Sequence, residues 1–186
     1  MEEKSFSRRE FLNVAAAGAA VAMAGQVFPI LGKSEPAPAV QMKLFVCSIC
    51  GHVEYGAAPE VCPVCHASKD NFKQNDALFT EAEAKLKDGG NSHNPEIIVK
   101  KKSELIKEQP CHEVEVRIGK VLHPMEESHH IRMIDCYVDD KYVSRIMFTT
   151  GLQPAATFQV KVGGKKVRIV EVCNLHGYWQ SEANLG

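Results

Sequence analysis

Four of the seven cysteines in this chain form two C-x2-C pairs, and this spacing constrains the fold more than any other feature of the sequence. The pairs are Cys47 with Cys50 and Cys62 with Cys65, separated by eleven residues. Each pair presents two sulfur atoms from one tight turn, so two facing turns make a tetrahedral cage of thiolates that holds zinc or iron. Disulfides are the alternative in an exported chain, but the short spacing and the adjacent glycine and prolines favour a metal.

A module built around this cage is short, and a short segment buries little apolar surface. We therefore expect the metal to supply much of its stability. Tyr55 and Phe72 are expected to form its small aromatic core. His52 and His66 flank the cysteine pairs and are expected to be exposed, because four thiolates already complete the site.

A second set of metal donors lies far downstream, in two separate segments. Residues 119–131 read GKVLHPMEESHHI, and residues 173–179 read CNLHGYW. His123 and His129 lie six residues apart across a polar turn, and Cys173 lies three residues before His176. Imidazole binds iron, zinc, copper and nickel, and one thiolate among several imidazoles donates charge strongly to the ion. This donor set favours a redox-active centre over a structural zinc site.

The bulk composition excludes one class of partner. A net charge of -1 and a pI near 6.7 give no electrostatic footprint for DNA or RNA, so we expect no nucleic-acid binding. Hydrophobic residues make up 45% and charged residues 24%, as in ordinary globular proteins. The length of 186 residues allows a small domain followed by a medium one. The oligomeric state stays open, and a homo-oligomer is one option.

The amino terminus has the pattern of a twin-arginine export signal. Arg8 and Arg9 precede an apolar run of small residues that ends in a small-x-small cleavage pattern at Ala24. We predict that residues 1–24 are a cleaved signal peptide and that residues 25–41, with three prolines, are a flexible linker. The mature protein is then expected in the periplasm, exported by the twin-arginine machinery.

Period-two alternation and turn residues predict a mainly β fold beyond the first module. Strands are expected at residues 113–118, 131–138 and 142–149. A hairpin is expected over residues 157–172, with Gly163-Gly164 as its turn. Several short strands without a convincing helix indicate a β-sandwich.

Residues 75–91 separate the two modules and are rich in helix formers. Thr80 with Glu83 fits a capping box, and Gly89 with Gly90 fits a helix stop. A short helix followed by a linker is therefore predicted here.

The motifs quoted above resemble two known families. Residues 46–72, VCSICGHVEYGAAPEVCPVCHASKDNF, resemble the rubredoxin-like module of rubrerythrins, which implies one iron that cycles between ferrous and ferric states. HPMEESHHI and CNLHGYW resemble the two signatures of the superoxide reductase family, the desulfoferrodoxin and neelaredoxin group, over roughly residues 93–183. This resemblance implies an immunoglobulin-like β-sandwich. The expected domains are a rubredoxin-like domain at 42–74, a helix and linker at 75–91, and a sandwich domain at 92–186.

In the superoxide reductase family a mononuclear iron is held by four histidines in a plane and one axial cysteine, and the sixth position is open. Carried over by motif, the resemblance assigns four ligands here: His123, His129, Cys173 and His176. His93 is the expected fourth histidine, because residues 91–95 read NSHNP and keep the family's His-x-Pro. His112 is the alternative, since it lies on the same side of its predicted strand as the apolar residues. His130 directly follows His129 and is expected to point elsewhere.

The resemblance implies one-electron reduction of superoxide to hydrogen peroxide at the His4Cys iron, which is re-reduced through the four-cysteine iron by an unidentified electron donor. The family's Glu-Lys pair is replaced here by Asn91-Ser92, so we expect water or hydroxide to cap the oxidised iron. Residues 100–102 are a lysine run that could supply a positive field, although such runs are usually surface charge.

Two other functional classes stay open from the sequence. A non-catalytic two-site electron carrier would use the same irons, and a structural zinc protein would use the same ligands. Cys111 and Cys136 are expected to be reduced and buried in or near strands. An exported location leaves a disulfide between them as an alternative.

Overall fold

The computed structural model describes residues 42–86 and 90–186 of the chain. The predicted signal peptide, its linker and the first glycine of the predicted helix stop lie outside the described residues. Within the described ranges, no helix is both long and apolar enough to cross a membrane.

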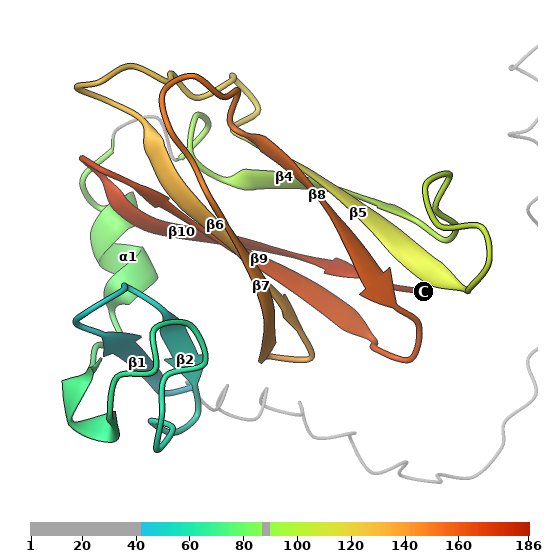
Figure 1. Cartoon of the computed structure of the whole chain (residues 1–186). Helices are drawn as coiled ribbons and strands as arrows, with labels where there is room; N and C mark the ends of the chain where they lie inside the picture. Colours follow the sequence, from blue (N-terminus) through green and yellow to red (C-terminus); the bar gives the residue numbers. More distant parts are fainter. Residues whose placement is uncertain (1–41, 87–89) are drawn as a thin grey trace, which may run out of the picture. The chain divides into compact units, whose positions relative to one another are not determined.

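The first module is a three-stranded antiparallel sheet in the order β2-β1-β3 (Figure 1). Its strands are β1 (Leu44–Cys47), β2 (Val53–Tyr55) and β3 (Phe72–Gln74), and a 3-10 turn, η1, spans Lys69–Asn71. Both cysteine pairs lie where the chain reverses direction, so the short strands serve mainly to bring the two turns together. Tyr55 is buried as expected, and Phe72 is half-buried.

A single short helix, α1 (Leu78–Glu83), follows the module. The predicted capping box is wrong, because Thr80 lies inside the helix and its hydroxyl donates to the Ala77 carbonyl at 3.0 Å. The upstream Asn75 side chain instead accepts a hydrogen bond from the Ala77 backbone N–H at 3.1 Å. An Asx turn at Asn75 therefore starts the helix, as this side chain often does in turns. The helix ends at Glu83, before the glycines that were expected to stop it.

The larger part of the chain is a sandwich of two antiparallel sheets (Figure 1). One sheet has the order β10-β9-β6-β7 and the other the order β4-β5-β8. The bounds of these strands are β4 (Pro95–Lys100), β5 (Cys111–Ile118), β6 (Ile131–Val138), β7 (Lys141–Met147), β8 (Ala155–Lys161), β9 (Lys166–Cys173) and β10 (Gly177–Asn184). The mainly β sandwich preceded by a small metal module and a short helix is confirmed.

The core between the two sheets is filled by inward-facing residues from both. They include Val114, Val116, Ile118, Ile131, Ile134, Cys136, Phe158, Val160, Val167 and Ile169. Burial of these side chains is the main stabilising term for such a sandwich. Cys111 and Cys136 are both free thiols, in different sheets.

The predicted hairpin over residues 157–172 is wrong, because β8 and β9 belong to different sheets. Gly163 does take a positive φ of 114°, as the turn required. However, the turn carries the chain across the sandwich, since Phe158 and Ile169 must face the same core from opposite sheets. Gly164 packs so closely that a Cβ there would lie 2.3 Å from a Val138 methyl group. The glycines were read correctly as a turn, but a turn alone does not say whether its strands pair.

Candidate metal centres

The four cysteines of the first module meet at one point. Cys47 Sγ lies 3.7 Å from Cys65 Sγ, and Cys50 Sγ lies 3.7 Å from Cys62 Sγ. All four sulfur atoms lie within 4.8 Å of one another. A tetrahedron with metal–sulfur bonds of about 2.3 Å has edges of about 3.8 Å. The cage therefore fits one tetrahedral metal ion, iron or zinc.

The two cysteine turns have the same backbone geometry. Gly51 N–H donates to the Cys47 carbonyl at 2.8 Å, and His66 N–H donates to the Cys62 carbonyl at 3.0 Å. Both residues have positive φ, 73° for Gly51 and 61° for His66. The first turn uses glycine for this conformation, whereas the second accepts the strain of a histidine in it. His66 is exposed, as expected.

The environment of the thiols differs across the cage. Burial raises the pKa of Cys50 to about 12, whereas a hydrogen bond from the Ala67 backbone N–H lowers the pKa of Cys65 to about 7. A bound cation would displace the thiol protons, because the thiolate is the form that binds metal.

The expectation that His52 is exposed is wrong, because its side chain is fully buried. The ring stacks against Tyr137, with centroids 5.9 Å apart, and its Nε2 lies 3.1 Å from Glu54 Oε2. Burial lowers the pKa of His52, but the nearby carboxylates of Asp135 and Glu54 outweigh that and leave the pKa raised. No local pattern indicates this burial, because the partners lie about eighty-five residues away in β6.

The second set of donors comes together from four separate segments. His93 precedes β4, the connection from β5 to β6 carries His123 and His129, β9 ends at Cys173, and His176 lies in the turn before β10. One donor atom from each of His93, His129, Cys173 and His176 lies within 4.8 Å of every other. His93 Nε2 lies 2.9 Å from His176 Nδ1, and Cys173 Sγ lies 3.5 Å from the same Nδ1.

The four imidazole rings form a four-sided arrangement, and His123 completes it. Neighbouring ring centroids are 4.7 Å apart for His93 and His123, 4.5 Å for His123 and His129, and 4.8 Å for His129 and His176. The last side, from His176 to His93, is also 4.8 Å, while the diagonal from His93 to His129 is 5.9 Å. Four imidazoles around one point with one nearby thiol match the expected donor set.

Local hydrogen bonds tie these segments to one another. The Asn174 side chain, next to Cys173, accepts a hydrogen bond from His130 N–H at 2.9 Å and donates to the Ser128 carbonyl at 3.0 Å. His123 N–H donates to the Ile118 carbonyl at 3.1 Å. The histidine-rich connection is therefore held against the cysteine turn by Asn174, a residue that the sequence motif contains but whose role it did not reveal.

The nitrogen atoms of the cluster are suited to hold a metal ion. His123 Nδ1 lies 2.6 Å from the Pro124 carbonyl, so this nitrogen carries the proton and Nε2 keeps its lone pair. The buried Nε2 atoms of His123 and His129 have no hydrogen-bond partner in the described part of the chain. Buried nitrogens of this kind are rarely left without a partner. Burial lowers the pKa of both rings, to about 4 for His123, which keeps them in the neutral form that binds metal.

His123 also gives a pH-dependent test of the metal-free fold. Its pKa is about 4 in the folded chain against an ordinary value of 6.5, because burial and the neighbouring histidines disfavour the cation. The unfolded chain therefore binds this proton more readily. We expect the free energy of unfolding to fall by about 2 kcal/mol as the pH drops from roughly 8 to roughly 5. Chemical denaturation of the metal-free protein measures the loss.

The matched variant for this test is His123→Gln, whose side chain takes up no proton. The variant should lose about 2 kcal/mol less than the wild type over the same pH range. Equal losses in the two proteins would mean that His123 is not the group responsible.

The structure separates the two candidates for the fourth histidine. His93 lies in the donor cluster, fully buried and stacked on Trp179 at 4.8 Å between ring centroids. His112 lies on β5, where it pairs with Val160 of β8, and it does not belong to the cluster. His130 also points elsewhere, with its Nδ1 3.0 Å from the Glu126 carbonyl.

Two buried residues beside the cluster were not singled out by the sequence reasoning. Trp179 covers one face of the His93 ring. Glu171 is fully buried on β9, two residues before Cys173, and its carboxyl oxygens have no partner among the described residues. Burial raises the pKa of Glu171 well above its usual range, and its proximity raises the pKa of Cys173 further beyond the effect of burial. A glutamate between two valines of β9 was the only available signal.

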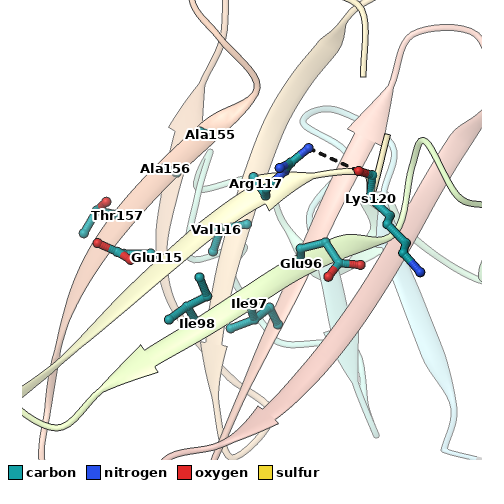
Figure 2. A pocket seen from close by; sticks show the side chains of 10 residues that line it. All are labelled: Glu96, Ile97, Ile98, Glu115, Val116, Arg117, Lys120, Ala155, Ala156 and Thr157. Carbon is teal, nitrogen blue, oxygen red and sulfur yellow. Dashed lines mark hydrogen bonds between the residues drawn. The ribbon is translucent and has the colours of Figure 1, made fainter. Parts of the chain in front are cut away.

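One groove of the sandwich lies apart from both donor clusters. It has a volume of about 620 Å³ and lies on the sheet formed by β4, β5 and β8 (Figure 2). Glu96, Ile98, Glu115 and Thr157 line it, and Arg117 donates to the Lys120 carbonyl at 3.2 Å along one side. None of the nine candidate ligands lies among its lining residues. The groove is therefore not a site for the chemistry of the metal centres.

A β-sandwich with a His4Cys cluster, joined to a small four-cysteine module, defines a class of protein with two candidate metal centres. Comparison with known families agrees with this description. The desulfoferrodoxin family model matches residues 82–182, and the rubredoxin-like domain of rubrerythrin matches residues 45–73. The chain belongs to the desulfoferrodoxin family.

Individual proteins are similar to this chain over different lengths. A desulfoferrodoxin homolog from Archaeoglobus fulgidus is 31% identical over 140 residues, which cover 75% of this chain and 96% of that protein. A superoxide reductase from Pyrococcus abyssi is 34% identical over 108 residues, covering 52% of this chain and 89% of that protein. The solved structure of a superoxide reductase from Nanoarchaeum equitans has 30% identity and a TM-score of 0.44, and the match covers 51% of this chain and 94% of that one.

Proposed function

We propose that this protein is a superoxide reductase that converts superoxide to hydrogen peroxide by one-electron reduction. The observation that carries the proposal is the convergence of four imidazoles and one thiol, with two buried Nε2 atoms left without partners in the described residues. Family membership and the relatives named superoxide reductase support it. The electron comes from outside the chain, through a donor that is not identified.

The proposed ligands of the second centre are His93, His123, His129 and His176, with the thiolate of Cys173. Iron suits this set, because a thiolate among imidazoles tunes a redox metal. When bound, iron supplies the one-electron chemistry that superoxide reduction needs. Reduction of one superoxide consumes one electron and two protons and yields one hydrogen peroxide. The chain's own contribution is to hold five donors in one place and to keep the imidazoles neutral.

The proposed ligands of the first centre are Cys47, Cys50, Cys62 and Cys65. Iron at this cage would store one electron for the second centre, as the rubredoxin-like match suggests. We also propose that the chain is exported to the periplasm by the twin-arginine machinery, which the arginine pair and the apolar run support. The proposed domains are the signal and linker at 1–41, the rubredoxin-like domain at 42–74, the helix and linker at 75–91 and the reductase domain at 92–186.

Rapid mixing of the reduced, iron-loaded protein with superoxide tests the function. We expect superoxide to disappear and one hydrogen peroxide to be released for each superoxide consumed. If the visible absorption of the protein instead changes in proportion to the superoxide added, and no hydrogen peroxide is released, the protein would be a two-site electron carrier. Colourless protein with zinc at both centres, found by metal analysis and visible spectra, would make it a structural zinc protein.

Two histidine variants test the ligand assignment. His93→Gln removes a donor from the cluster, so we expect metal affinity at the second centre to fall by about tenfold or more. His112→Gln is the matched control, because His112 is a partly buried histidine of the same domain but lies outside the cluster. It should keep its metal and its activity. Metal content and superoxide consumption measure both variants, and the reverse result would make His112 the ligand.

A further inference from the structure

The outer face of the four-stranded sheet is covered by the first module. The last seven residues of β9 are buried on both faces of the sheet. An apolar cluster joins Leu44, Val53 and Tyr55 of the module to Tyr137 and Val170 of the sheet. Tyr137 is fully buried, and its hydroxyl donates to the Val53 carbonyl at 2.8 Å. The module is therefore packed on the sheet, and not only tethered to it by the chain.

A buried ion pair fastens the cysteine cage to this face. Arg145 on β7 donates from both Nε and Nη2 to the Asp135 carboxylate on β6, each at 2.6 Å. Its Nη1 donates to the carbonyl of Cys50 at 2.7 Å. The side chains of Arg145 and Asp135 are 7% and 2% exposed. A buried guanidinium needs all of these partners, so the carbonyl of a cage cysteine is part of how this charge is accommodated.

A second contact leads from the same cysteine turn towards the other cluster. A Cβ on Gly51 would lie 2.7 Å from the Tyr178 hydroxyl oxygen, so the Gly51 backbone and the phenol are in direct contact. Gly51 directly follows Cys50 of the cage. Tyr178 lies on β10, two residues after His176 of the second cluster. One non-covalent contact thus joins a residue next to one donor set to a residue near the other.

We propose that the contact between Gly51 and Tyr178, held in place by Arg145 and Asp135, is the path by which an electron passes from the four-cysteine centre to the His4Cys centre within one chain. The inference rests on the proposed function, because it needs iron at both centres. With iron held by the four cysteines and by the His4Cys set, the transfer would move one electron, from ferrous iron at the first centre to ferric iron at the second. No bond forms or breaks.

The phenol serves as a contact between the cysteine turn and β10. The ring matters because it fills the space between the turn and β10. Tyr178 and Arg145 are therefore positioning residues, since neither belongs to either donor set.

Flash photoreduction of the fully ferric protein, without superoxide, tests the path directly. The visible bands of the two irons report how fast an electron that enters at the four-cysteine centre appears at the His4Cys centre. In the wild type this rate should not depend on protein concentration. In Tyr178→Leu we expect it to fall by about tenfold or more, because the bridging ring is lost and the contact is no longer held. Tyr178→Phe loses the hydroxyl but keeps the ring, whose Cζ would lie 3.8 Å from a Cβ on Gly51, so it should slow the transfer less than Tyr178→Leu does.

The matched control is Tyr142→Leu. Tyr142 lies near the same cysteine turn, with its ring centroid 5.0 Å from that of His52. It belongs to β7, however, and β7 carries none of the candidate ligands. Its loss should leave the transfer rate unchanged. Arg145→Met should slow the transfer through undocking of the module, and Arg145→Lys should restore part of the rate. Hydrogen exchange of β1 to β3 in the zinc-loaded variants reports docking independently of iron.

Each outcome decides the matter. The path would be overturned if Tyr178→Leu protein keeps its module docked and transfers electrons as fast as the wild type. It would also be overturned if the transfer rate of the wild type rises with protein concentration, because electrons would then pass between copies. If Tyr178→Leu fails to fold, two measurements still test the path. They are the dependence of the wild-type transfer rate on protein concentration, and the transfer rates of Arg145→Met and Arg145→Lys. A transfer that behaves as expected in a protein that releases no peroxide would instead refute only the proposed function.

Discussion

Cys173→Ser is expected to lower the rate of superoxide reduction by about 100-fold or more, the larger end of the effects seen when metal-site residues are changed. The thiol is 2% exposed and lies 3.5 Å from His176 Nδ1, inside the donor cluster. Serine keeps the size but replaces a soft thiolate by a hard hydroxyl, which is a poor ligand for this set. The measurement is superoxide consumption together with the visible spectrum and the iron content of each centre.

Cys136→Ala is the matched control for this variant. Cys136 is also a free, fully buried cysteine of the sandwich, but it lies in the hydrophobic core and not in either donor set. Its loss should cost about 1–2 kcal/mol of unfolding free energy, as for a small cavity, and leave iron binding unchanged. A Cys173→Ser protein that keeps both its iron and its activity would contradict the ligand assignment.

The paired residues of each cluster could be found from the sequence because their spacing is local, and the family resemblance brought the separate pairs together. Cys47 and Cys50 must share one turn, and so must Cys173 and His176, whatever the rest of the fold does. The strand at residues 131–138 was also a local prediction, and its β-branched and aromatic residues predicted its bounds without error. His93 was chosen from a short motif, and the structure places it in the cluster.

Long-range contacts account for what the sequence did not show. His52 looked like a solvent-exposed neighbour of a metal ligand, but it is buried against Tyr137, far away in the chain. The glycines at 163–164 predicted a turn, and only the placement of β8 and β9 in different sheets shows that the turn crosses the sandwich. Periodicity tells which side of a strand is apolar, but not which sheet the strand joins.

Gly119→Ala is expected to lower the free energy of unfolding by about 3–5 kcal/mol and to disrupt the His4Cys centre, as a strained and overpacked site does. Gly119 has a φ of 84°, and a Cβ there would lie 2.2 Å from the Val121 carbonyl oxygen and 2.6 Å from that of Ser92. Its N–H also donates to the Asn94 carbonyl at 3.1 Å. Gly119 is thus the place where the segment that carries His93 meets the segment that leads to His123.

Gly163→Ala separates the effect of backbone strain from the effect of this close approach. Gly163 lies in the same sandwich with a φ of 114°, but nothing lies within 4 Å of a Cβ placed there. It should lose only about 1–2 kcal/mol, the cost of a positive φ for alanine. It should also bind metal like the wild type. Denaturation and metal titration measure both variants. If Gly119→Ala lost no more than Gly163→Ala and kept its metal, the two ligand-bearing segments would not depend on their contact at Gly119.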